Sequence, residues 1–172
     1  FIPFIGGTPI TLFSSTNGVV ITAPSAAPPV ANPDTGTTNA NTALNGTTVL
    51  GNDTGTGIFV SSYDHTSMQS GTVVMQSNGT YVYTPHTNYS GIDSFSYTIT
   101  DSIGQTSSTT VTITVLPFAH NDSGSVAANT SLNQTTSVLS NDAGTGLVVT
   151  SYEHTSGAGG TIVMQTNGTY VY

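Results

Sequence analysis

The sequence contains no lysine and no arginine, while aspartate and glutamate together number eight. A chain without cations cannot neutralise phosphate groups, so neither nucleic acids nor anionic membrane surfaces are expected partners. The absence of lysine also excludes lysine–asparagine isopeptide crosslinks. Cysteine is absent too, so packing and strand pairing must supply the stability that disulfides give to many exported domains.

Long apolar runs and a basic N-terminal leader are missing as well. No run approaches the roughly 20 residues of a membrane-spanning helix, and no leader with a cleavage site is visible, so membrane insertion is not expected. Charged residues make up only 5% of the chain. Valine, isoleucine, tyrosine and threonine nevertheless alternate in long runs, which indicates a folded β-protein rather than a disordered chain.

The pattern that organises the chain is an internal repeat of about 89 residues. The hexapeptide NGTYVY at 78–83 recurs at 167–172. Further matches pair Asp34 with Asp122, Asn52-Asp53 with Asn141-Asp142, and YDHT at 63–66 with YEHT at 152–155. The repeat divides the chain into an N-terminal segment at 1–30, a first repeat at 31–117 and a second repeat at 118–172.

Short alternating runs predict an all-β fold for each repeat. Phe95, Tyr97 and Ile99 alternate with serine and threonine, so one face of this strand is expected to be buried and the other wet. Asn78-Gly79 predicts a two-residue hairpin turn. In the first repeat we expect strands at 42–50, 58–63, 72–77, 80–84, 94–100 and 109–115. Strands of this length between glycine, asparagine and proline turns are typical of a β-sandwich.

The same residues resemble a known family. The resemblance is carried by Asn52-Asp53, the run from Asn78 to Pro85, the run from Tyr89 to Tyr97, Asp101, and the run from Val111 to Val115. These motifs are similar to the tandem cadherin-like or immunoglobulin-like repeats of large microbial surface proteins. The resemblance implies extracellular, seven-stranded sandwiches strung in series. It also implies a role in adhesion, biofilm formation or surface structure, often with calcium between domains.

The second repeat is expected to be incomplete, because Tyr172 aligns with Tyr83 and the counterparts of residues 84–118 are absent. Those counterparts would hold the last two strands of the sandwich. Without them, Leu147, Val149, Tyr170 and Tyr172 should be exposed, and each large apolar side chain in water forfeits about 1.5–3 kcal/mol. An open strand edge also invites pairing with another strand.

The N-terminal segment is a candidate for that other strand. Two apolar β-prone runs flank Asn17-Gly18 and predict a hairpin, followed by an extended proline-rich spacer at 24–33. We expect this hairpin to enter the open sandwich of a second copy, which gives head-to-tail association and a filament. The interface would consist of Phe1, Ile2, Phe4, Ile10, Leu12, Val20 and Ile21 from the donor, and of Leu147, Val149, Tyr170 and Tyr172 from the acceptor.

The functional prediction is therefore a structural subunit of an extracellular filament whose partner is another copy of itself. The alternative is that the sequence is a fragment of a larger repeat adhesin or biofilm protein that attaches cells to an unknown surface or matrix ligand. No constellation of residues supports catalysis, since the chain has no nucleophile elbow, phosphate loop or metalloprotease helix. We expect the protein to be extracellular or attached to the cell surface, and not to be an enzyme.

Calcium is the only cofactor that the sequence suggests. Calcium takes six to eight oxygen ligands, whereas each acidic cluster here offers one or two carboxylates. Turn formation by aspartate and asparagine explains the same positions equally well. The candidate ligands are Asp34, Asp53, Asp101, Asp122 and Asp142.

Asparagine sequons and histidines complete the set of candidates. Asn-x-Ser/Thr sequons mark surface loops in exported proteins, and candidate glycosylation sites are Asn45, Asn88, Asn129 and Asn133. Asn78 and Asn167 are also sequons, but we expect tight turns there with φ > 0 at the asparagine. His65 and His154 occupy equivalent positions beside Asp64 and Glu153. Two copies of one catalytic site are improbable, so a structural role is expected for both.

Overall fold

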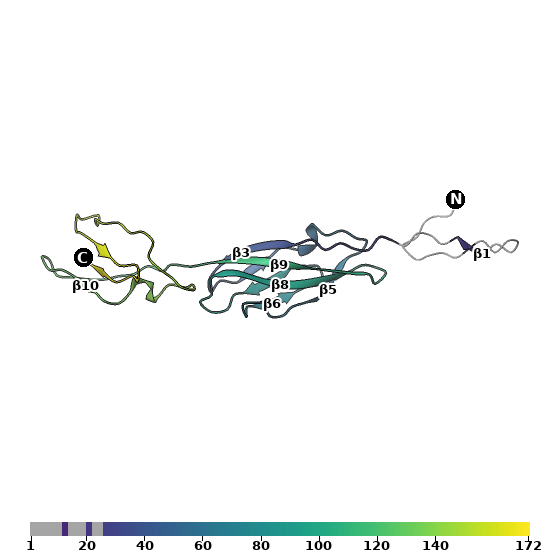
Figure 1. Cartoon of the computed structure of the whole chain (residues 1–172), viewed down its shortest axis with the longest axis horizontal. Helices are drawn as coiled ribbons and strands as arrows, with labels where there is room; N and C mark the ends of the chain where they lie inside the picture. The colour runs from purple at the N-terminus through teal and green to yellow at the C-terminus, as the bar shows by residue number, and fades with distance from the viewer. Residues whose placement is uncertain (1–11, 14–19, 22–25) are drawn as a thin grey trace.

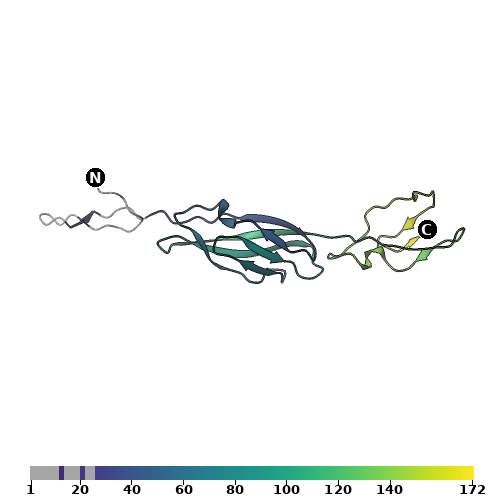
Figure 2. The ribbon, with the colours of Figure 1, turned by 180° about the vertical axis from the view of Figure 1, so that it is seen from behind.

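The computed structural model describes residues 12–13, 20–21 and 26–172. Within these residues the regular structure is β-strand, apart from two short 3-10 turns, η1 (Val49–Gly51) and η2 (Val138–Ser140), and the all-β prediction is confirmed. None of the described segments forms a helix that could cross a membrane. The molecule is elongated, with a β-sandwich in its middle and residues 118–172 continuing from one end of that sandwich (Figure 1, Figure 2).

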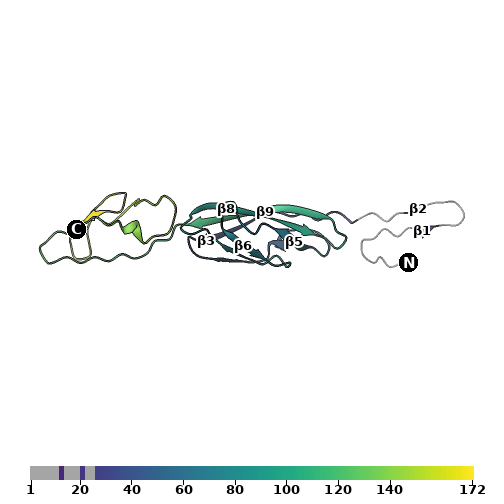
Figure 3. The ribbon, with the colours of Figure 1, turned by 90° about the horizontal axis from the view of Figure 1, so that it is seen from below.

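The first repeat folds as two facing sheets. One sheet has the strand order β3 (Asp34–Asn39), β9 (Thr106–Leu116), β8 (Gly91–Thr100) and β5 (Phe59–Tyr63). The other has the order β4 (Leu44–Gly46), β7 (Tyr81–Thr84) and β6 (Thr72–Met75). All neighbours are antiparallel except β3 and β9, which run parallel. The long β8–β9 pair runs along the body of the sandwich (Figure 3).

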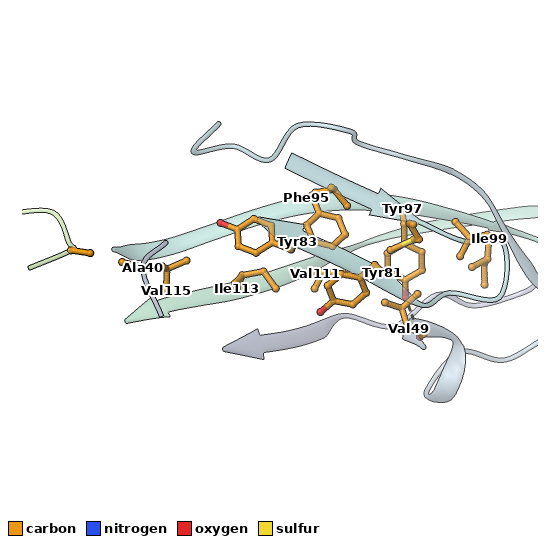
Figure 4. Close-up of a cluster of buried hydrophobic side chains, with 14 residues drawn as sticks. Ala40, Val49, Tyr81, Tyr83, Phe95, Tyr97, Ile99, Val111, Ile113 and Val115 are labelled. Carbon is orange, nitrogen blue, oxygen red and sulfur yellow. Dashed lines mark hydrogen bonds between the residues drawn. The ribbon is translucent and has the colours of Figure 1, made fainter. Parts of the chain in front are cut away.

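The core lies between these sheets and follows from the alternation seen in the sequence. The buried inward positions of β8 and β9 are apolar except for Asp93, while the serines and threonines between them point outward. Figure 4 shows Tyr81, Tyr83 and Phe95 gathered with Tyr97 in this core. The rings of Tyr81 and Phe95 meet edge to face with centroids 5.4 Å apart, an arrangement that aromatic pairs favour. Burial of these large side chains is the main stabilising term of the sandwich.

Strand β3 is the element that the sequence analysis missed. The six expected strands all overlap observed ones, but Asp34–Asn39 reads DTGTTN and contains no large apolar residue. It forms because its backbone pairs with β9, with Asp34 opposite Val111 and Asn39 opposite Leu116. The expected strand at 42–50 is shorter than predicted. It gives way to η1, which Thr48 caps by accepting a hydrogen bond from the Leu50 amide at 3.2 Å.

The turn at Asn78-Gly79 differs from the two-residue form that was expected. Gln76 donates its amide to the Thr80 carbonyl, so the loop contains three residues rather than two. Only Gly79 has a positive φ, of 83°, and the prediction that Asn78 needs φ > 0 was wrong. Asn78 instead accepts hydrogen bonds from the amide and the hydroxyl of Thr80 through its side-chain oxygen. Short side chains of this kind stabilise a turn without a left-handed backbone.

Two smaller sheets lie outside the sandwich. In residues 118–172, β10 (Asn133–Gln134), β12 (Tyr170–Val171) and β11 (Val163–Met164) form an antiparallel sheet in that order. In the N-terminal segment, β1 (Leu12–Phe13) pairs antiparallel with β2 (Val20–Ile21), as a hairpin requires. The remaining donor candidates Phe1, Ile2, Phe4 and Ile10 lie outside the described residues.

Candidate functional site: the open half-sandwich of residues 118–172

Residues 118–172 reproduce the local structure of the first repeat. The same backbone bridge opens both repeats, the same hydroxyl cap begins both 3-10 turns, and the same tyrosine–histidine ring contact recurs. The pairs are Val30–Thr54 and Phe118–Ala143 for the bridge, Thr48 and Ser137 for the cap, and Tyr63–His65 and Tyr152–His154 for the rings, with centroids 4.4 and 4.5 Å apart. The repeated sequence therefore folds in the same way locally, histidines included.

Only one of the two sheets forms in this second unit. The sheet β10–β12–β11 corresponds to β4–β7–β6 of the first repeat. Residues 122–127 and 148–152 align with β3 and β5, but they are not strands. In the first repeat β3 pairs with β9, and β5 pairs with β8. Residues 118–172 hold no counterpart of β8 or β9, so the flanking segments have no strand to pair with. We call this unit the open half-sandwich.

Side chains that would be core are accordingly less buried than their counterparts in the first repeat. Tyr83 is fully buried, whereas its counterpart Tyr172 is 36% exposed. Val149 and Met164 are half-buried, although the equivalent residues of the first repeat are core. A hollow of about 340 Å³ lies beside Val149, Tyr152 and Met164. Val60, the counterpart of Val149, lies opposite Ile99 of β8, so this hollow marks where an inward side chain of that strand is missing.

In the first sandwich, Tyr97 of β8 ties the central strand to the start of the repeat. Its hydroxyl lies 2.8 Å from Asp34 Oδ2, and Asp53 Oδ2 and the Asn32 carbonyl both lie at 3.2 Å. A hydroxyl carries one proton, so the nearest carboxylate is its main acceptor. Burial first, and then the hydrogen bond to Asp34, raise the pKa of Tyr97. Burial, together with the Asp53 charge, raises the pKa of Asp34 despite that hydrogen bond.

The open half-sandwich contains the carboxylates of this network without the phenol. Asp122 and Asp142 correspond to Asp34 and Asp53, and Asp142 accepts the His120 amide at 2.7 Å, as Asp53 accepts the Asn32 amide at 2.7 Å. Among the described residues no donor bonds to the Asp122 carboxylate. A hollow of about 240 Å³ lies here, lined by residues that include Asn121, Asp122, Val138, Asn141 and Tyr170.

A second polar network is centred on Asp93 of β8, which is 1% exposed. Its Oδ2 accepts the hydroxyls of Ser67 at 2.5 Å and Tyr83 at 2.6 Å, and its Oδ1 accepts the amides of Gln69 and Ser94. Four donors compensate the burial of this carboxylate without any cation. Sequence reasoning missed this network, although Asp93 occupies an inward position in the alternation with Phe95 and Tyr97.

The open half-sandwich contains the donors of this second network without the carboxylate. Ser156 and Tyr172 correspond to Ser67 and Tyr83, and their hydroxyl oxygens lie 3.2 Å from each other. The Ser156 hydroxyl also accepts the Gly160 amide at 3.0 Å, as the Ser67 hydroxyl accepts the Gly71 amide at 2.8 Å. Both hydroxyls are therefore held close to the positions that they would need to reach a carboxylate.

The candidate calcium ligands do not meet in one cluster. Asp34 and Asp53 share the Tyr97 hydroxyl, and Asp122 and Asp142 occupy the equivalent place in the second unit. Asp101 lies elsewhere and accepts the amides of Ile103 and Gln105 in the β8–β9 turn. The described residues contain no group of three or more acidic or histidine side chains placed to hold a metal ion. Calcium binding stays a prediction.

The candidate glycosylation sites lie on the surface. Asn45, Asn88, Asn129 and Asn133 are all exposed. Asn88 exchanges two hydrogen bonds with Asn41, both at 2.8 Å, and has a positive φ of 57°. A glycan on its side-chain nitrogen would lie beside this pair, whereas Asn45 and Asn133 project from strand positions. Glycosylation of any of them stays a prediction.

A short joint connects the first sandwich to the open half-sandwich. The Thr145 amide donates to the Ser90 hydroxyl at 2.8 Å, and the Ser90 amide donates to the Thr145 hydroxyl at 3.2 Å. Within the second unit, Phe118 and Ala143 exchange backbone hydrogen bonds of 2.8 and 2.9 Å, which hold the residues next to this pair. Ala143 is buried at the joint. The two units are thus linked by more than the covalent chain.

The comparison with known families agrees with this architecture. A family model described as a bacterial Ig domain matches residues 26–114, which is more than half of the chain. No curated protein matches the chain. Bacterial Ig-like domains typically occur in surface or extracellular proteins. With seven strands in two facing sheets and a matching family model, the chain belongs to the bacterial Ig domain family.

Proposed function

We propose that this chain is a structural part of an extracellular assembly, in which Ig-like sandwiches are joined in series and residues 118–172 are closed by strands added from outside that range. The role is mechanical and not catalytic. The observation that carries the proposal is the open half-sandwich. One sheet is formed, and no second sheet faces its inner side chains or the polar groups of Asp122, Ser156 and Tyr172.

The energetics favour completion of this unit. Full burial of a large apolar side chain is worth about 1.5–3 kcal/mol, and several inward residues of the open half-sandwich are only half-buried, so they gain part of this free energy when they are covered. Two strands at the places of β8 and β9 would cover Val149, Met164 and Tyr172, and would give residues 122–127 and 148–152 their backbone partners. Strand addition to a sheet combines main-chain hydrogen bonds with side-chain pockets.

One version of this proposal is a filament. The hairpin of β1 and β2 in one copy would enter the open half-sandwich of the next, and such head-to-tail association does not close on itself. The donor residues would be Phe1, Ile2, Phe4, Ile10, Leu12, Val20 and Ile21, packed against Leu147, Val149, Tyr170 and Tyr172. The antiparallel pairing of β1 with β2 supports this version, because the missing β8–β9 unit is also a hairpin.

A second version is a segment of a surface adhesin or biofilm stalk, in which cadherin-like or Ig-like units follow one another in the same polypeptide. The joint between Ser90 and Thr145 supports this version, since it links consecutive units by reciprocal hydrogen bonds. The Val30–Thr54 bridge of the first sandwich repeats the bridge at Phe118–Ala143. Each unit therefore begins with the same connection, as a serial array requires.

Electron microscopy and amide hydrogen exchange test the proposal on three proteins: the chain 1–172, a deletion of residues 1–25, and a matched deletion of residues 1–9 that keeps both strands of the hairpin. Fibres that form with 1–172 and are lost only with the larger deletion support the filament. Single particles in all three, with fast exchange at residues 163–172, support the stalk. Slow exchange at residues 163–172 in a monomer that lacks residues 1–25 would contradict both the filament and the stalk, because the half-sandwich would already be closed.

A further inference from the structure

We propose that the open half-sandwich selects its closing strand by two polar groups: a carboxylate at the position of Asp93 and a phenol at the position of Tyr97. The occupant is a hairpin of the β8–β9 kind, whose inward face reads Asp-x-aromatic-x-Tyr. This inference rests on the proposed strand addition and specifies the chemistry of the strand that is added.

The first sandwich shows how these two groups are held. Asp93 and Tyr97 lie four residues apart on the inward face of β8, with Phe95 between them, and both are 1% exposed. Asp93 supplies only acceptor atoms, which bind the hydroxyls of Ser67 and Tyr83, whereas Tyr97 supplies a donor to the carboxylate of Asp34. A single strand therefore satisfies two sites of opposite polarity at fixed spacing.

The open half-sandwich contains the counterpart residues of both sites. Asp122 borders the 240 Å³ hollow together with Asn141, and the next residue, Asp142, is held by the His120 amide as Asp53 is held by the Asn32 amide. These carboxylates accept, and a phenol would donate to them. At the other site, Ser156 and Tyr172 offer hydroxyl donors that a carboxylate would accept. The open half-sandwich therefore needs a donor from the closing strand at the first site and an acceptor from it at the second.

This chemistry disfavours the N-terminal segment as the closing strand. Residues 1–25 contain no aspartate, glutamate or tyrosine. An apolar hairpin in the groove would take water from Asp122 and Asp142 without donating to them, and would leave the hydroxyls of Ser156 and Tyr172 without a carboxylate. A buried polar group that loses water and gains no partner is costly. The closing hairpin is therefore expected to be of the β8–β9 kind and not the N-terminal one.

The test appends a copy of residues 84–116 after Tyr172 of the full chain, so that the copy continues the second repeat. Within the appended copy, four variants are compared with the unchanged one: Asp93→Asn, Tyr97→Phe, a double Asp93→Leu and Tyr97→Leu change, and the control Ser96→Ala at an outward position. The double leucine copy presents an all-apolar inward face like that of the N-terminal hairpin. Amide exchange at residues 163–172 reports closure of the half-sandwich.

We expect the unchanged copy and the Ser96→Ala control to protect residues 163–172 equally. Each single polar change should lower the protection by about tenfold to a hundredfold, as the loss of one buried hydrogen-bond partner does. Equal protection by the double leucine copy would overturn the selection by polar groups while leaving strand addition intact. If no copy protects these residues, strand addition itself is wrong and the proposed function fails with it.

Discussion

The hydroxyl of Tyr97 lies 2.8 Å from the carboxylate of Asp34, and this contact joins a central strand to a residue 63 positions earlier in the chain. Asp34 begins β3, the edge strand without large apolar residues. The hydrogen bond therefore helps to fix a strand that hydrophobic burial alone does not hold. The same phenol also faces Asp53, whose negative charge raises the pKa of Asp34.

Replacement of Tyr97 by phenylalanine should lower the free energy of unfolding of the first sandwich by about 1–3 kcal/mol, since the half-buried carboxylates lose their donor while the ring stays in the core. Chemical denaturation of the full chain measures the change. Tyr63→Phe is the matched control, because the Tyr63 hydroxyl makes no hydrogen bond to the described residues, and it should stay within about 0.5 kcal/mol of wild type. An equal loss in both variants would contradict the assigned role.

The same tyrosines predict how stability depends on alkaline pH. Burial and the neighbouring carboxylates raise the pKa values of Tyr83 and Tyr97 above the ordinary value of a phenol. A raised pKa in the folded state means that the unfolded chain loses its phenol protons first, so this stability is complete below pH of about 10 and falls as pH rises above it. One unit above that value, each tyrosine should cost about 1.4 kcal/mol.

Denaturation midpoints between pH 8 and 11 check this expectation, with phenolate absorbance to follow ionisation. Tyr97→Phe removes one of the phenols with a raised pKa, so its midpoint should fall less steeply with pH than that of the wild type. A midpoint that stays constant through pH 11, or the same slope in both proteins, would show that these phenols do not govern alkaline unfolding.

The Asp93 carboxylate should be more sensitive to substitution than an exposed carboxylate that also accepts an amide. Asp93→Ala removes the acceptor of two buried hydroxyls, and we expect a loss of about 3 kcal/mol or more in the free energy of unfolding. Asp64 is exposed and accepts the Ser96 amide at 2.9 Å, so Asp64→Ala serves as the control with a loss of about 1 kcal/mol. Similar losses in the two variants would argue against a special role for the buried network.

Calcium should have little effect on the first sandwich. Asp34 and Asp53 already face the Tyr97 hydroxyl, and calcium prefers six to eight oxygen ligands. We expect the same melting temperature in calcium and in chelator, and a flat calorimetric titration. Heat uptake that disappears in Asp53→Asn would instead establish the predicted site, with Asp101→Asn as a control at a carboxylate that belongs to a different turn.

The sequence indicates those parts of the fold that depend on local alternation. β8 and β9 alternate clearly because one of their faces is core, and the turn around Gly79 was located correctly. Strand β3 could not be predicted from its polar sequence DTGTTN, because it forms by pairing with β9, which lies far away in the sequence. The three-residue geometry of the Asn78 turn was not predicted either. The Thr48 hydroxyl, 30 residues earlier in the chain, donates to the Asn78 carbonyl, and a local sequence pattern does not report such a contact.

The candidate site was predictable in outline and not in chemistry. The alignment of Tyr172 with Tyr83 indicates missing strands, and the structure describes an unpaired inner face in these residues. The two polar networks could not be derived, because Asp34 and Tyr97 meet only after the sheet has formed. One signal was available: Asp93 shares its inward register with Phe95, and a charged residue in such a register requires a specific set of donors.

The joint between the two units should control orientation rather than stability. The double change Ser90→Ala and Thr145→Ala removes the two hydroxyls that bridge the units, while the Phe118–Ala143 backbone bonds remain. Exposed hydrogen bonds of this kind contribute about 0.5–1.5 kcal/mol each, which is enough to bias a hinge but not to unfold the sandwich. Small-angle scattering and residual dipolar couplings should therefore show a wider spread of inter-unit angles with an unchanged unfolding midpoint. Thr56→Ala is the control, because Thr56 is the counterpart of Thr145 and its hydroxyl makes no hydrogen bond to the described residues; an equal spread in this variant would remove the role assigned to Ser90 and Thr145.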